Sequence, residues 1–260
     1  PPAPSAVPAP PPARPLAARR ALPRLIAKMN HAGVDKSTSG IVVPTGYMVE
    51  VMIGEGLLME LDHSKIPNLS NLEPQFADTP FDPGNKYSIP KDFGTTGFGY
   101  RSEFVKEEMA SWEDFYRLAS KYSGRYVVLD SAAEIVGSAL KMLGYSYNSV
   151  EPNEIAEATK EILALKPHVR KITSSMRELM ISGECYVALT WNGEIGYVAI
   201  DAPDARYVVP EEGTEVWTDN WSVVADPPHP AAAHAYLNWS LDPEVQAGSI
   251  EEVLVERAAV

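Results

Sequence analysis

Cysteine is almost absent from the sequence, because Cys185 is the one such residue among 260. A single cysteine excludes an internal disulfide framework and a zinc site built from several thiolates. The five histidines show no H-x-x-x-H or H-x-x-E spacing, which argues against a catalytic metal. No apolar run approaches the roughly 20 residues that a membrane-spanning helix needs, so a spanning protein is excluded. We expect no metal site, no cofactor and no transmembrane segment.

Motifs typical of enzymes are missing as well. The sequence has no G-x-S-x-G nucleophile motif, no phosphate-binding P-loop and no glycine pattern of a dinucleotide site. We therefore expect that the chain is not an enzyme.

Basic residues are scarce, since 22 Lys and Arg stand against 35 Asp and Glu, a formal net charge of −13. Residues 1–40 hold six of the cations and one acid, which leaves 16 cations and 34 acids, or −18, for the other 220 residues. A body this acidic repels polyanions, which argues against nucleic acid and anionic membranes as partners. It would steer cations toward itself, although many proteins are acidic for solubility alone.

Proline dominates the start of the sequence, with eight prolines in residues 1–15. This composition predicts an extended, mobile, polyproline-like tail over residues 1–21. The tail lacks the 7–15-residue apolar core of a secretory signal peptide, so no leader is visible. A linker or tether fits this composition, and an organelle transit segment is the alternative.

Beyond the tail, predicted strands alternate with predicted helices, which favours an α/β fold with a largely parallel, helix-covered sheet. Strands are expected at 40–44 (buried), 94–100, 126–129, 168–172, 185–190, 206–209 and 216–224, with turns and one short strand over 62–92. Helices are expected at 22–29, 47–53, from 111, 131–143, 151–165, 174–181, 193–200 and 230–241.

Chemically useful side chains follow several of these strands, where open α/β sheets bind ligands. The candidates are Thr45, Tyr47, Asp130, Ser131, Glu134, Trp191, Trp217 and Asp219. Trp217 and Asp219 are two residues apart on one strand and therefore face the same side. Carboxylates bind ammonium groups by charge-assisted hydrogen bonds, while aromatic faces cover methylenes and attract cations. The set predicts a site for an organic cation.

Each candidate also has a purely structural interpretation. Ser131 and Glu134 form the S-x-x-E pattern of a capping box and could simply begin a helix. The two tryptophans could be core aromatics, Asp219 could close a turn, and Tyr47 could pack at the start of a helix.

Ten sequence strings resemble the bacterial spermidine/putrescine-binding proteins, in order from about residue 22 to about 247. They are VVPTGYMVEVM (42–52), LDHSKIPNLSNL (61–72), FDPGNKYSIP (81–90), GTTGFGY (94–100), SWEDFY (111–116), LDSAAE (129–134), LGYSYNS (143–149), TWNGE (190–194), PEEGTEVWTDN (210–220) and PHPAAAHAYLNWSLDPEV (228–245).

The resemblance implies a two-lobed periplasmic-binding-protein-like fold (type 2) that closes on its ligand by a hinge motion. It further implies a polyamine, putrescine or spermidine, in the cleft between the lobes, an ABC transporter permease as partner, and a periplasmic or cell-surface location. All eight candidates fall on the family's ligand-contacting motifs. Lobe one would comprise residues 22–95 and 221–260, and lobe two 96–220, with crossovers near Gly94 and Asp219.

The sequence departs from the family at three places. The family has a strand, an aromatic ligand loop, a helix and a second strand before the position of Leu22, and it continues beyond the helix at 230–246. It usually has an acid where Ser131 stands. These differences predict an incomplete lobe one with an unpaired sheet edge beside residues 41–43, where another chain or the tail could add a strand. A truncated gene product, a repurposed scaffold that acts through protein–protein contact, and a non-polyamine ligand remain alternatives.

Overall fold

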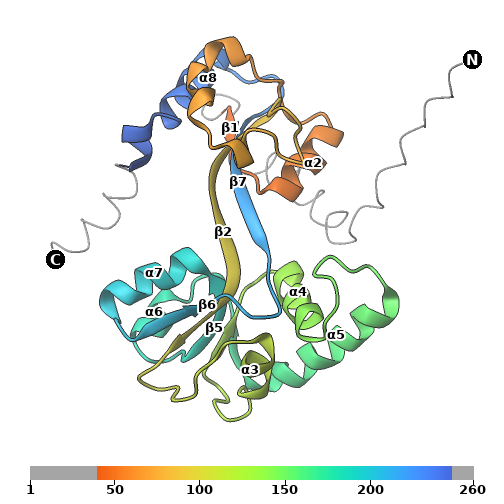
Figure 1. Cartoon of the computed structure of the whole chain (residues 1–260), viewed down its shortest axis with the longest axis vertical. Coiled ribbons are helices and arrows are strands. Elements are labelled where there is room, and N and C mark those ends of the chain that lie inside the picture. Colours follow the sequence, from red (N-terminus) through yellow and green to blue (C-terminus); the bar gives the residue numbers. More distant parts are fainter. Residues whose placement is uncertain (1–39, 248–260) are drawn as a thin grey trace, which may run out of the picture.

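The computed structural model describes residues 40–247 (Figure 1). The predicted tail and the predicted helix over 22–29 lie outside these residues. Figure 1 shows the described elements in two groups, which the long strands β2 and β7 join. No helix within 40–247 is long and apolar enough to span a membrane.

One mixed sheet runs through both groups, in the strand order β1-β7-β2-β5-β3-β4, with β6 paired to β2. The strands are β1 (Ile41–Val42), β2 (Ser88–Arg101), β3 (Tyr126–Val128), β4 (Val169–Ile172), β5 (Val187–Trp191), β6 (Ala205–Val208) and β7 (Val216–Val223). Only β3 pairs in parallel, with β4 and β5, and the other described pairs are antiparallel. The expectation of a largely parallel sheet is therefore wrong. Helical crossovers enforce parallel pairing around β3, whereas β5, β6 and β7 all run back along β2.

The helices lie close to their predicted positions. They are α2 (Gly46–Gly54), α3 (Trp112–Arg117), α4 (Ala132–Met142), α5 (Pro152–Leu165), α6 (Arg177–Ile181), α7 (Asn192–Asp201) and α8 (Pro230–Ser240), with short 3-10 helices at His63–Lys65, Pro67–Asn71, Pro74–Phe76 and Lys166–His168. Ser111 begins α3 with a full capping box, because its hydroxyl accepts from the Asp114 N–H at 3.0 Å and its own N–H donates to the Asp114 carboxylate at 3.2 Å.

The two largest hydrophobic cores lie one in each group. The larger core is centred on Phe98, Trp112, Phe115 and Tyr126, each with no exposed surface, and unites β2, β3, β5 and α3. The smaller is centred on Ile66, Ile89, Val223 and Leu237, and unites the segment around residues 61–72, the start of β2, the end of β7 and α8. Strand β2 therefore contributes to both cores, through Ile89 at one end and Phe98 at the other.

Strand β2 changes partner halfway along its length. Residues Ser88 to Thr95 pair with β7, whereas Thr96 to Tyr100 pair with β5. The change falls between the two cores, so the ribbon of β2 and β7 connects them.

Strand β1 is shorter and more exposed than predicted. It comprises two half-buried residues, and Val43 beyond it is 44% exposed. Because β1 lies at the end of the described strand order and pairs only with β7 there, one of its edges has no described neighbour. The expectation of a buried strand at 40–44 is therefore wrong.

Candidate ligand-binding site

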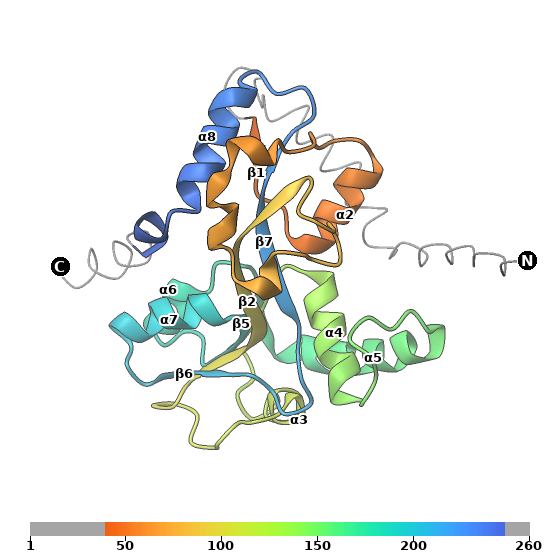
Figure 2. The same ribbon diagram turned by 45° about the horizontal axis from the view of Figure 1, so that its top comes forward.

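One face of the ribbon formed by β2 and β7 gathers the predicted acidic and aromatic residues. Strands β2 and β7 run side by side (Figure 2). Directly paired residues of antiparallel strands share a face, and the pairs here are Asp92 with Asp219 and Gly94 with Trp217. The pairing continues one step further, since the Thr96 N–H donates to the Glu215 carbonyl at 3.2 Å. Trp217 and Asp219 alternate along β7 and face the same side, and Glu215 directly precedes the strand at the next alternate position.

Asp219 is held from the start of helix α2. The Thr45 hydroxyl donates to Asp219 Oδ1 at 2.7 Å, and the two residues also form an isolated β-bridge. Thr45 occupies the N-cap position of α2, but its side chain makes no capping hydrogen bond. The hydroxyl is therefore committed to the carboxylate, which joins two residues 174 positions apart in sequence.

Residues of β2 and β5 hold the side chain of Glu134 in place. It lies in the first turn of α4, is 8% exposed, and its Oε1 accepts from the Trp191 indole N–H at 2.6 Å and from the Thr96 hydroxyl at 3.1 Å. Ser131 is the N-cap residue of α4 but makes no side-chain cap bond. The capping-box interpretation of Ser131 and Glu134 is therefore wrong, because the carboxylate turns toward β2 and β5 instead.

The sequence analysis missed Glu215, a second carboxylate near Glu134. Glu215 Oε2 accepts from the Tyr147 hydroxyl at 2.9 Å and lies 3.4 Å from the Thr96 hydroxyl oxygen. A hydroxyl has one hydrogen, so Thr96 can donate to Glu215 or to Glu134 but not to both. Burial raises the pKa of Glu215, and the negative charge of Glu134 raises it further, while hydrogen bonds from Tyr147 and Thr96 oppose the shift.

Tyr47 lies within electrostatic reach of all these carboxylates, although it is 61% exposed. The pKa of its hydroxyl is raised, first by loss of hydration. The negative charges of Glu215, Glu134 and Asp219 raise it further, in that order. Tyr47 belongs to α2 and Glu134 to α4, and α2 lies above α4 in both Figure 1 and Figure 2.

Trp217 covers the ribbon at Gly94. A Cβ atom on Gly94 would lie 2.4 Å from the indole Cζ2 and 2.5 Å from Asn192 Oδ1, so only glycine leaves room for the ring there. The indole N–H of Trp217 is buried and has no hydrogen-bond partner within residues 40–247. Trp217 and Trp191 are both half-buried, and Trp191 also packs against the core around Phe98, so their role in binding stays a prediction.

Asp130 and Ser131 line a cavity of about 390 Å³ beside α4, α5 and β4, together with apolar residues such as Ile135 and Ile162, and none of the other six candidates lines it. No hydrogen bond or ion pair described within 40–247 joins their side chains to the other six. Their role in binding stays a prediction.

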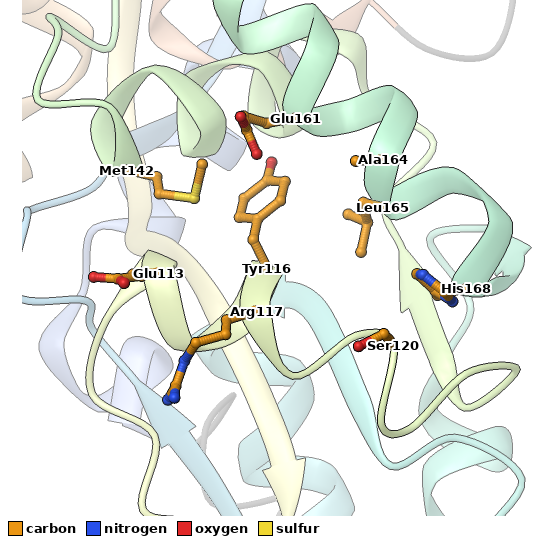
Figure 3. Close-up of a pocket in the computed structure, with 9 residues that line it drawn as sticks. All are labelled: Glu113, Tyr116, Arg117, Ser120, Met142, Glu161, Ala164, Leu165 and His168. Atoms are coloured by element: carbon orange, nitrogen blue, oxygen red, sulfur yellow. The ribbon is translucent and has the colours of Figure 1, made fainter.

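A second cavity, of about 450 Å³, lies between α3, α4 and α5 (Figure 3). It is lined by Tyr116, Arg117, Glu161 and His168 among others, and by none of the eight candidates. Within residues 40–247 no group of three or more His, Cys, Asp or Glu side chains could hold a metal ion. Cys185 is fully buried, and burial raises the pKa of its thiol to about 12.

Comparison with known proteins places these features in a family. A family model for the bacterial extracellular solute-binding protein matches residues 21–252. The spermidine/putrescine-binding periplasmic protein of Escherichia coli (strain K12) is 36% identical over 208 residues, covering 79% of this chain and 59% of that protein. Spermidine/putrescine-binding periplasmic protein 1 of Haemophilus influenzae is 34% identical over 203 residues, covering 77% and 56%. The chain thus spans less than three fifths of the length of these two curated relatives.

A comparison with solved structures supports the same family. The solved spermidine/putrescine ABC transporter substrate-binding protein of Streptococcus pneumoniae matches with a TM-score of 0.73 at 33% identity, covering 86% of this chain and 68% of that one. The predicted α/β fold of periplasmic binding proteins is confirmed, as is the prediction of a binding protein rather than an enzyme. The chain belongs to the family of bacterial extracellular solute-binding proteins.

Proposed function

We propose that the chain binds a polyamine, such as spermidine or putrescine, between its two groups of elements. The names of its relatives in Escherichia coli, Haemophilus influenzae and Streptococcus pneumoniae support this ligand class. In this proposal the groups are the two lobes, residues 22–95 with 221–260 and residues 96–220, and the ribbon of β2 and β7 is the hinge between them.

The proposal rests on two carboxylates, each hydrogen-bonded to a residue of a different group, that have no cationic partner within residues 40–247. Thr45 orients Asp219 from one group, and Trp191 orients Glu134 from the other. Neither carboxylate forms an ion pair with a Lys, Arg or His of residues 40–247. A ligand with an ammonium group at each end supplies the missing cations on both sides.

The aromatic side chains complete the chemistry of the site. Trp217 lies between Asp219 and Glu215 on the same strand face, and Trp191 lies beside Glu134. An indole face attracts a cation by about 0.5–2 kcal/mol and also covers methylene groups. Polyamines carry both features, because their ammonium groups are separated by short methylene chains.

In the cell, we propose, the chain is exported and serves as the solute-binding component of an ABC importer. It would deliver the polyamine to a permease on the membrane surface. The description of its family as extracellular supports the location. The acidic body, at −18 over residues 41–260, suits a cationic ligand, since a negative surface raises the rate of encounter with cations.

Thermal denaturation in the presence of spermidine, putrescine or butanediol tests the proposal. Butanediol matches putrescine in chain length but has no charge. A ligand at a hundredfold its Kd stabilises the folded state by about 2.7 kcal/mol, or about 5–10 °C for a protein of this size. We expect such a rise with an amine and none with butanediol. No rise at millimolar amine would refute the proposal and favour the repurposed scaffold.

A further inference from the structure

Glu215 has a position that its local sequence does not explain. It directly precedes the strand that carries Trp217 and Asp219, two residues before Trp217, and its carbonyl accepts from the Thr96 N–H. Its side chain accepts a hydrogen bond from the hydroxyl of Tyr147, in the loop between α4 and α5, at 2.9 Å. The carboxylate is therefore fixed in place although it has no basic partner within residues 40–247.

Glu215 and Glu134 converge on one hydroxyl group. Thr96 Oγ1 lies 3.4 Å from Glu215 Oε2 and 3.1 Å from Glu134 Oε1, so both carboxylates lie within hydrogen-bond distance of it. The single hydrogen of Thr96 satisfies one carboxylate at a time, and the shorter distance favours Glu134. Two negative charges this close repel each other, and the repulsion ends when a cation binds between them.

An ammonium group is chemically suited to a pair of neighbouring carboxylates. It has three hydrogens to donate and no acceptor, and hydrogen bonds to carboxylates are the strongest that it forms. Trp191 donates to Glu134, and Tyr147 donates to Glu215. Because a carboxylate has several lone pairs, each acid can still accept a hydrogen bond from an ammonium group. The two acids would then accept two of its three donors.

We propose that Glu215 and Glu134 together bind one terminal ammonium group of the ligand, while Asp219 binds the other end. The inference rests on the proposed function and adds to it a specificity-determining residue. Four residues along a strand span about 13 Å, so Glu215 and Asp219 act on opposite ends of a ligand that lies along Trp217.

Isothermal titration of spermidine and putrescine into the Glu215→Gln variant tests the role of Glu215. Glutamine keeps an acceptor for Tyr147 and removes the charge. We expect the affinity for the better ligand to fall about 10- to 100-fold, the scale of a charged hydrogen bond. Glu211→Gln is the matched control, because Glu211 is an exposed acid of the preceding loop. The control should bind within twofold of the wild type.

A double-mutant cycle separates a shared ammonium subsite from a general effect of charge. Glu215→Gln and Glu134→Gln should be non-additive, since both acids contact one group, whereas Glu215→Gln and Asp219→Asn should be additive. Thermal denaturation without ligand checks that each variant folds, and Glu215→Asp, which keeps the charge, should recover part of the affinity.

The outcomes distinguish this inference from the proposed function. If the wild type binds an amine and Glu215→Gln binds it equally well, the role of Glu215 is wrong and the proposed function stands. An equal loss in Glu211→Gln would show that overall charge, rather than this subsite, governs affinity. If the wild type binds no amine, both proposals are overturned.

Discussion

Replacing Asp219 by asparagine removes one charge from the site and little else. The Thr45 hydroxyl, 2.7 Å from Asp219 Oδ1, can donate to an amide oxygen in the same place. The fold at the junction of α2 and β7 should therefore survive. A hydrogen bond from an ammonium group to a carboxylate contributes about 1.5–3 kcal/mol, so the affinity for a polyamine should fall roughly 10- to 150-fold.

The assay is isothermal titration of spermidine into the variant, with Asp226→Asn as the control. Asp226 is exposed and has a φ of 55°, a conformation that asparagine also tolerates. The control carries the same change in net charge and should bind like the wild type. Equal affinities of the wild type and Asp219→Asn would refute the assignment of Asp219 to the ligand. A lower melting temperature of the ligand-free variant would show that the charge also supports the fold.

Three further changes test other parts of the structure. Gly94→Ala should lower the free energy of unfolding by about 1–3 kcal/mol, because the new Cβ would lie 2.4 Å from the Trp217 ring. Urea denaturation measures this change as a lower midpoint, and an unchanged midpoint would contradict the close packing. Trp191→Phe removes the 2.6 Å donor of buried Glu134 and should cost about 1–3 kcal/mol in thermal denaturation, so full stability would contradict that bond. The raised pKa of Glu215 means that the folded state keeps its proton longer than the unfolded one, so ligand-free stability should fall as pH rises from the ordinary 4.5 through the raised value. Glu215→Gln should flatten that slope in melting curves, and an identical slope would contradict the shift.

Local sequence patterns were enough to predict most of the helices and strands. Helix α5 begins one residue after its predicted start, and the hydroxyl–acid spacing of Ser111 and Asp114 forms a capping box. The shared face of Trp217 and Asp219 follows from the period of a strand alone. Such features depend on neighbours a few residues away, which the sequence shows directly.

Features that depend on distant partners were harder to predict. The direction of strand pairing is decided by which strand returns along β2, so the mixed sheet was not visible in the alternation of elements. The spacing of Ser131 and Glu134 fits a capping box as well as it fits a ligand site. The carboxylate of Glu134 instead accepts from the indole of Trp191, 57 residues away, and the local sequence does not show this contact. Glu215 was missed, although counting back in twos from Asp219 places it on the same strand face.

Titration of spermidine into the wild type and into the Glu134→Gln/Asp219→Asn variant tests the central claim most directly. The claim is that two carboxylates, Asp219 held by Thr45 and Glu134 held by Trp191, bind the two ends of one polyamine. We predict a saturable isotherm for the wild type and a loss of more than about 100-fold for the variant, because two charged hydrogen bonds are removed. A wild type that binds no spermidine, or a variant that binds it as tightly, would contradict the claim.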